Sequence, residues 1–96
     1  MPRSYGRPGF VLQSLRVEIH RAARKHGILD EDVRHAVEHA LVMYPLAENQ
    51  GPARTLHLGP DRAGNLLEVV VLHLDDGRLL AIHAMRMRPG YAALLP

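Results

Sequence analysis

The second half of the sequence gathers side chains that exchange protons or carry positive charge. They stand on or just beyond expected strands, at His57, His73, His83, Arg54, Arg86, Arg88 and Tyr91. Cleavage of RNA without a metal requires a base for the 2′-hydroxyl, a cation for the phosphorane charge and an acid for the leaving oxygen. Histidine, arginine and tyrosine supply all three. The same spacing also fits solvent-facing strand residues, so both interpretations stay open.

A second grouping, His35-Ala36-Val37-Glu38-His39, matches the H-x-x-E-H pattern of zinc peptidases. The two histidines are four residues apart and share one face of an expected helix. That face is opposite the apolar stripe, so it points at solvent, and Glu68 is the only carboxylate that suggests a third ligand. We therefore expect a solvated helix face, no metal site and no cofactor.

Other site classes are excluded by what the sequence lacks. Without cysteine there is no disulfide scaffold, no thiolate zinc site and no cysteine nucleophile. The segment Gly59 to Gly64 lacks the Lys-Ser/Thr pair of a phosphate loop, and the only serines are Ser4 and Ser14, which argues against a Ser-His-Asp triad. No apolar run approaches about 18 residues and the start is polar, so we expect no membrane span, no signal peptide and a cytoplasmic protein.

The size and charge of the chain indicate one small, mildly basic domain. With 96 residues, 47% of them hydrophobic, it can bury a single core. The net charge of +2 conceals a basic segment up to Lys25, followed by a segment from Gly27 to Glu48 in which only Arg34 opposes five acids. This asymmetry indicates either two different partners or ordinary solvated faces.

The spacing of apolar residues predicts the elements that position these groups. Residues 1–13 are expected to form an irregular arm and 14–96 a single domain. A short basic helix is predicted from Leu15 to His26, although its first turns fit an edge strand equally well. A second helix has Asp30 as its N-cap and stops at or before Tyr44, because Pro45 disfavours helix there.

Strands are expected to follow, with Pro45 confining the first to an edge. They lie around Val42–Ala47, at Arg54–Leu58, at the central run Leu66–Leu74 and at Arg78–Met85, before a short helical turn from Pro89 to Leu95. The fold class is therefore α+β: two N-terminal helices packed on a three- to four-stranded antiparallel sheet, with a short C-terminal helical turn.

Asp76-Gly77 predicts a two-residue hairpin that sets the strand register. This turn pairs His73 with Leu80 and Val70 with His83. It places Leu80, Ala84 and Arg86 on one face of the sheet, and His83 and Met85 on the other.

Several segments, in consistent order over roughly residues 17–91, resemble BrnT-like toxins of the RelE-type superfamily. The likeness lies in Arg24-Lys25-His26-Gly27-Ile28 before an acidic N-cap, in Arg54-Thr55-Leu56-His57-Leu58-Gly59, in Leu66-Leu67-Glu68-Val69-Val70-Val71, and in Ile82-His83-Ala84-Met85-Arg86 with Tyr91 beyond. The family usually has Ile-Ser-Ala-Arg in that last strand. His83 therefore stands at its serine and Met85 at its arginine, and the last helix is short and apolar here.

The resemblance implies the toxin of a bacterial type II toxin–antitoxin pair, a ribonuclease that cleaves mRNA, on the ribosome or off it, and is neutralised by a small cognate antitoxin. By this reading the catalytic residues are His83, Arg86 and Tyr91, and Lys25, Arg54, His57 and Arg88 hold the RNA. A homodimer and a toxin–antitoxin hetero-oligomer both remain open. The alternative is a non-catalytic BrnT-like module that pairs with a protein or RNA.

Overall fold

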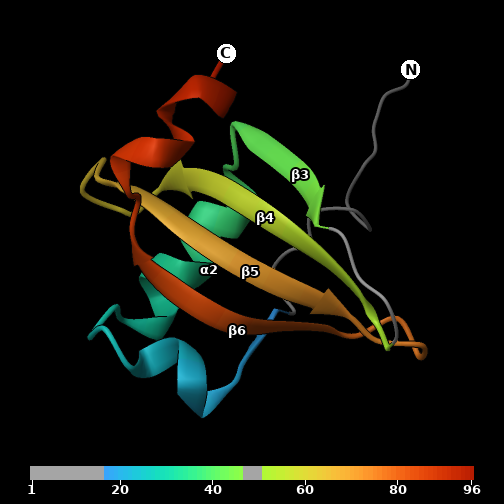
Figure 1. Ribbon diagram of the computed structural model, residues 1–96. Helices are drawn as coiled ribbons and strands as arrows, with labels where there is room; N and C mark the ends of the chain where they lie inside the picture. The colour runs from blue at the N-terminus through green and yellow to red at the C-terminus, as the bar shows by residue number, and fades with distance from the viewer. Residues whose placement is uncertain (1–16, 47–50) are drawn as a thin grey trace, which may run out of the picture.

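A five-stranded sheet organises the computed structural model, which describes residues 17–46 and 51–96. The arm predicted for residues 1–13 lies outside the described residues. The strands are β2 (Glu18–Ile19), β3 (Val42–Leu46), β4 (Ala53–Pro60), β5 (Leu66–His73) and β6 (Leu79–Arg86). They are ordered β2-β6-β5-β4-β3 across the sheet (Figure 1). β2 runs parallel to β6, and the other neighbours are antiparallel.

The α+β class is confirmed, but the sheet has five strands instead of three or four, and one pair is parallel. The additional strand is β2, which lies where a helix from Leu15 to His26 was predicted. The helix prediction is wrong for its first turns, because Val17 is buried and Ile19 pairs with Ala81, as the alternative of an edge strand requires. Within residues 17–26, the described part of this segment, Arg21–Arg24 form the 3₁₀ helix η1.

The second predicted helix is present as α2 (Asp30–Glu38), and it ends well before Pro45. Its N-cap is Leu29 and not Asp30, which is the first helical residue. The Asp30 carboxylate instead accepts two hydrogen bonds from the Arg24 guanidinium, at 3.0 and 2.8 Å, and so ties the helix to η1. The C-terminal turn is the 3₁₀ helix η2 (Pro89–Leu94). No helix within residues 17–46 and 51–96 has the length and apolar character to cross a membrane.

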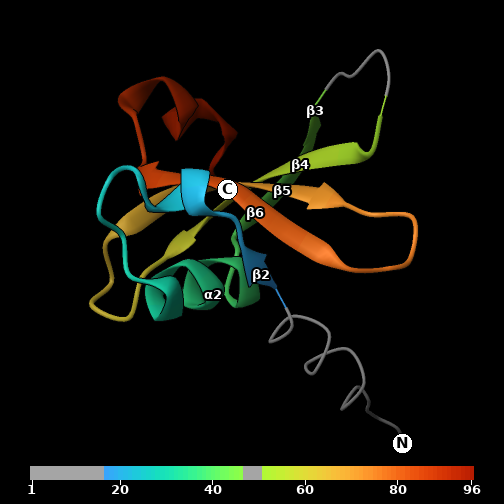
Figure 2. The ribbon, with the colours of Figure 1, turned by 90° about the horizontal axis from the view of Figure 1, so that it is seen from below.

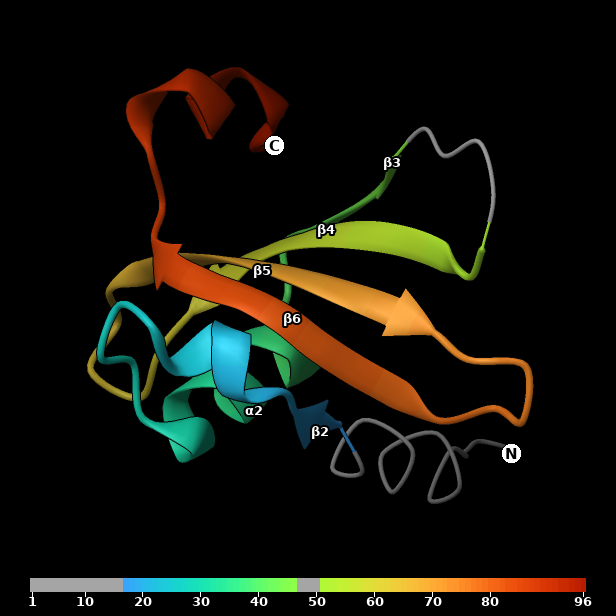
Figure 3. The ribbon, with the colours of Figure 1, turned by 60° about the horizontal axis from the view of Figure 1, so that its bottom comes forward.

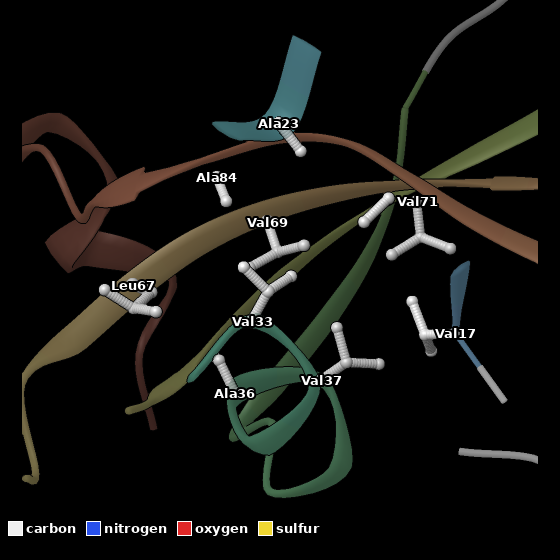
Figure 4. Close-up of a cluster of buried hydrophobic side chains, with 10 residues drawn as sticks. Val17, Ala23, Val33, Ala36, Val37, Leu67, Val69, Val71 and Ala84 are labelled. Atoms are coloured by element: carbon white, nitrogen blue, oxygen red, sulfur yellow. The ribbon is translucent and has the colours of Figure 1, made fainter. Parts of the chain in front are cut away.

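The helices cover both faces of the sheet. α2 lies against one face and η2 lies over the other (Figures 2 and 3). The core forms between α2 and the sheet, where the apolar stripe of the helix meets the inward residues of β5 and β6 (Figure 4). It consists of Val17, Ala23, Val33, Ala36, Val37, Leu67, Val69, Val71, Ala81 and Ala84. Because these residues are small and aliphatic, helix and sheet pack closely.

Gly59 in β4 lies directly against the backbone of α2. A Cβ atom at this position would lie 2.2 Å from the Ala36 carbonyl oxygen and 3.0 Å from Cα of Ala40, both of them backbone atoms. We expect Gly59→Ala to push α2 away from β4 and to lower the free energy of unfolding by about 1–3 kcal/mol. Urea denaturation measures this loss. Gly90→Ala is the control because a Cβ there meets nothing within 4 Å; equal stability of the two variants would contradict the close contact.

The register between β5 and β6 determines which face His83 occupies. Next to the turn, His73 pairs with Leu79, so the predicted pairing with Leu80 is wrong. A β-bulge between Val70 and Val71 then shifts the register by one residue and pairs Val70 with His83, as predicted. His83 and Met85 therefore face away from α2, on the face opposite Ala84 and Arg86, as predicted. Leu80 was expected on the face of Ala84, but it lies on the same face as His83.

Candidate functional site

Glu68 is a charged residue in the middle of the central strand β5, and it is 0% exposed. Its strand neighbours Leu67 and Val69 face the core below the sheet, so the Glu68 side chain lies on the opposite face, towards η2. A carboxylate out of contact with water is costly unless it is paired and hydrogen-bonded. The residues that hydrogen-bond to Glu68 are therefore the candidates for a functional site on this face of the sheet.

Four hydrogen bonds surround the Glu68 carboxylate. Arg88 donates three of them: from its backbone N–H at 2.9 Å and from Nε at 3.1 Å to Oε1, and from Nη2 at 2.7 Å to Oε2. His83 donates the fourth, from Nε2 to Oε2 at 2.8 Å. Burial raises the pKa of a carboxyl, but these hydrogen bonds outweigh burial and hold the pKa of Glu68 below its ordinary value. Glu68 is thus an ionised anchor that orients the two other side chains.

The contact with Glu68 fixes the orientation of the His83 imidazole. An ionised carboxylate only accepts hydrogen bonds, so Nε2 carries the proton and the other nitrogen, Nδ1, keeps its lone pair in the neutral ring. No described residue hydrogen-bonds to His83 Nδ1, and this atom is not among the buried side-chain atoms that lack a partner. The side chain is 29% exposed. His83 therefore presents a proton-accepting nitrogen to solvent.

Two more side chains adjoin this pair. The Arg88 guanidinium carbon lies 5.8 Å from the centre of the Tyr91 ring, a distance at which a cation is attracted to an aromatic face. The His26 ring, just after η1, meets the His83 ring edge to face with centroids 5.9 Å apart. Glu68, His83, Arg88, Tyr91 and His26 together form what we term the Glu68 cluster.

The Glu68 cluster has the parts needed for proton transfer to or from a bound anion. Its two imidazoles can each accept or donate a proton through a ring nitrogen. Arg88 keeps one guanidinium nitrogen, Nη1, outside its contacts with Glu68, and its side chain is 57% exposed. A planar guanidinium in this position suits a phosphate oxygen. The arrangement can hold a phosphodiester beside two imidazoles without a metal ion.

The structure brings together three of the residues singled out in the sequence, His83, Arg88 and Tyr91. Arg86 is exposed, but it pairs with Leu67 on β5 and so belongs to the face opposite His83. The guanidinium next to His83 is that of Arg88. This follows from the alternation of a strand, which sends the side chain one residue after Met85 to the other face.

Two of the residues expected to hold RNA lie at the surface. Lys25 is exposed and directly precedes His26 of the cluster. Arg54 is also exposed and pairs with Leu72 on the same face as Glu68. It is four residues along β4 from Leu58, which pairs with Glu68. A strand rises about 3.3 Å per residue, so Arg54 stands roughly 13 Å away along the sheet.

His57, by contrast, lies within the fold and is only 4% exposed. It pairs with Val69 and faces α2, on the opposite side from the Glu68 cluster. Its Nε2 shares the Thr55 hydroxyl oxygen with Nε2 of His73, at 2.9 and 2.7 Å. Its Nδ1 is the one buried side-chain nitrogen or oxygen without a partner in the described ranges. The structure therefore separates His57 from the other predicted RNA ligands.

The burial of His57 makes the fold sensitive to acid. Burial, with a smaller contribution from His73, lowers the pKa of His57 to about 4. In the unfolded chain, His57 binds a proton with a pKa near 6.5. The free energy of unfolding therefore keeps its full value above that pH and decreases as the pH drops towards 4. We expect a loss of about 2–3 kcal/mol between pH 7 and pH 4.5, measured by urea denaturation. His57→Gln should flatten this dependence while exposed His20→Asn should not; an unchanged slope in His57→Gln would contradict the assignment.

Two members of the cluster, Glu68 and His26, were not among the predicted site residues. Glu68 carries a signal in the sequence, because a carboxylate within a run expected to be buried on both faces must have charged partners. His26 carries no such signal, since its position at the end of a predicted helix does not place it near His83. Its contact follows from β2 and η1, which bring this segment alongside β6.

Comparison of the chain with protein-family models, with curated proteins and with solved structures finds no match.

Proposed function

We propose that this chain is a metal-independent endoribonuclease, the toxin of a bacterial type II toxin–antitoxin pair that acts on mRNA. The observation that carries the proposal is the carboxylate of Glu68, which holds an imidazole and a guanidinium on one face of the sheet, with a second imidazole adjacent. The ordered segments shared with BrnT-like toxins support the same reaction class. The proposal replaces Arg86 with Arg88 as the residue that stabilises the phosphate.

The reaction proposed is an internal transesterification. His83 Nδ1 accepts the proton of the 2′-hydroxyl as the 2′-oxygen attacks phosphorus. The bond from phosphorus to the 5′-oxygen breaks, and the leaving oxygen takes a proton from His26. The products are a 2′,3′-cyclic phosphate and a 5′-hydroxyl. Two positioned acid–base groups of this kind contribute about 10²–10⁴-fold each.

Arg88 and Tyr91 complete the proposed site. The guanidinium stabilises the additional negative charge that forms on the phosphorus oxygens in the transition state. Tyr91 offers a ring on which a base can stack, and the exposed Lys25 and Arg54 extend the positive surface along the backbone of the RNA.

The alternative is a binding module that holds RNA or a protein partner without cleavage. It is favoured by the exposed apolar side chains of Leu41, Met43 and Tyr44 on and next to the edge strand β3, which suit a protein contact such as that with a cognate antitoxin. RNA binding that weakens with salt, with no cleavage, would support the module.

Induced expression tests the proposal in cells. The wild-type chain should arrest growth and shorten transcript half-lives, and co-expression of its cognate antitoxin should relieve both. The matched pair is His83→Ala, expected to be harmless, and Arg86→Ala, expected to remain toxic. Equal toxicity of the two variants would exclude His83 from the mechanism, and absence of toxicity in the wild type would favour the binding module.

A further inference from the structure

Tyr44 in the edge strand β3 is an exposed aromatic side chain outside the Glu68 cluster. It is 48% exposed. Tyr44 and Tyr91 are the two tyrosines within residues 17–46 and 51–96. An exposed tyrosine ring is suited to packing against a protein partner or against a nucleic-acid base. The face of the sheet to which Tyr44 belongs, and the charges on that face, distinguish these two partners.

The strand register places Tyr44 in one row with His83. Each of the strands β6, β5, β4 and β3 contributes one residue to this row, namely His83, Val70, Leu56 and Tyr44. Directly paired residues share a face, so Tyr44 and His83 project from the same face of the sheet, the one towards η2. Neighbouring strands are about 4.8 Å apart, so three strand spacings separate the two residues by roughly 14 Å (Figure 1).

Within β3–β6, this face carries no exposed carboxylate. The one acidic residue of these four strands is Glu68, which is 0% exposed and bound by Arg88. Arg54 is exposed and pairs with Leu46, two residues beyond Tyr44 in β3. Diagonal neighbours of this kind lie about 7–8 Å apart, so the guanidinium can reach a phosphate next to a base on Tyr44. The surroundings of Tyr44 are therefore positive, which suits the backbone of a nucleic acid.

The neighbouring residue Met43 is also exposed, but it belongs to the other face of the sheet. It pairs with His57, whose side chain lies on the α2 side. Alternation along the strand therefore sends Met43 and Tyr44 to opposite faces, although they are 62% and 48% exposed. A ligand on the face towards η2 contacts Tyr44 and not Met43, whereas a partner that covers the whole edge contacts both.

We propose that Tyr44 stacks on an unpaired base of the RNA whose scissile phosphate lies at His83, and that Arg54 contacts a phosphate between them. This inference rests on the proposed ribonuclease function and specifies its substrate. Aromatic rings and cations along one surface hold single strands in this way. A base inside a duplex has its faces covered by its neighbours, so Tyr44 selects unpaired RNA. The roughly 14 Å between the two positions requires a strand of several nucleotides.

Binding of a fluorescently labelled single-stranded RNA of about ten nucleotides, measured by anisotropy, tests this position. The RNA carries 2′-O-methyl groups, so that it cannot be cleaved. Tyr44→Leu removes the ring but keeps an apolar side chain beside Leu56, and it should weaken binding by about 5- to 100-fold. Tyr44→Phe keeps the ring and should bind like the wild type. Arg54→Gln should weaken binding and reduce its salt dependence by about one phosphate contact.

Met43→Leu is the matched control, because it changes an equally accessible residue of the same strand on the opposite face. It should bind RNA like the wild type, and both leucine variants should keep their thermal midpoints within a few degrees. Absence of RNA binding by the wild type would overturn the proposal. Equal RNA affinity of the wild type and Tyr44→Leu would also overturn it, and would assign the exposed side chains of β3 to a protein partner.

Cleavage of the unmodified RNA separates this inference from the ribonuclease proposal. Tyr44→Leu should raise KM and leave the single-turnover rate at saturating RNA near the wild-type value, because the ring is remote from the reacting atoms. Cleavage with an unchanged KM in Tyr44→Leu would overturn the role of Tyr44 alone. RNA binding that depends on Tyr44, without any cleavage, would uphold this binding position and overturn the ribonuclease proposal alone.

Discussion

Replacing His83 with alanine is expected to lower the rate of RNA cleavage by about 10²–10⁴-fold. The physical reason is the tautomer that Glu68 imposes: the 2.8 Å bond to Nε2 leaves Nδ1 as the proton acceptor at the surface. Without the ring, the 2′-hydroxyl has no positioned base. The measurement is the single-turnover rate on a short defined RNA. RNA affinity should change little, because Lys25, Arg54 and Arg88 remain.

Arg86→Ala is the control for this result, since Arg86 lies on the opposite face of the sheet from His83. It should cleave RNA at close to the wild-type rate. His83→Ala should also keep its thermal midpoint within a few degrees, because the ring is partly exposed and Glu68 retains its three bonds from Arg88. A variant that lost Arg86 and cleaved as slowly as His83→Ala would contradict the assignment of Arg88.

Replacing Arg88 with alanine is expected to produce the largest loss of stability. The Glu68 carboxylate would keep only the bonds from His83 and from the backbone N–H of residue 88, and would lose its cation. A buried charge left without its partner destabilises a fold strongly. In a chain of this size the thermal midpoint should fall by more than about 10 °C. Thermal denaturation followed by circular dichroism measures this fall, and an unchanged midpoint would contradict the importance of the pair.

A double variant separates the structural role of the pair from its catalytic role. In Glu68→Met with Arg88→Met, both charges are absent and apolar side chains of similar length take their place, an exchange that is often neutral or stabilising. The thermal midpoint should recover most of its loss, while RNA cleavage should remain absent. Recovery of cleavage together with stability would show that Arg88 contributes only to the fold.

Local patterns predicted those elements that depend on neighbours in the sequence. The apolar stripe of α2 and the run of β5 each depend on residues close together in the chain, and both are present. A hairpin also forms at Asp76-Gly77, but Leu74 pairs with Arg78, so its loop has three residues instead of the predicted two. The segment from Val17 to His26 was ambiguous because helix and strand periods both fit it. Pairing with β6, about sixty residues later in the sequence, makes Glu18–Ile19 a strand, and Arg21–Arg24 then form the 3₁₀ helix η1.

The candidate site could likewise be predicted only in part, because some of its contacts join segments that are distant in the sequence. His83 and Tyr91 follow from the resemblance and their residue types, and alternation along the strand already places Arg86 on the face opposite His83. The contact of Arg88 with Glu68 depends instead on the path of the chain after β6 ends. His57 alternates like a surface residue in the sequence, yet α2 crosses β4 near Gly59 and covers it. Bulges and helix crossings are set by packing between distant segments, and the residue pattern alone does not encode them.

Cleavage of a defined single-stranded RNA by the purified chain in excess EDTA tests most directly whether the Glu68 cluster is a metal-independent ribonuclease site. We predict cleavage that leaves a 2′,3′-cyclic phosphate, is lost in His83→Ala and persists in Arg86→Ala. A 2′-deoxyribose placed at the mapped position should block cleavage, because it removes the attacking hydroxyl. Uncleaved RNA, cleavage abolished by EDTA, or cleavage at the deoxyribose position would each contradict the proposed mechanism.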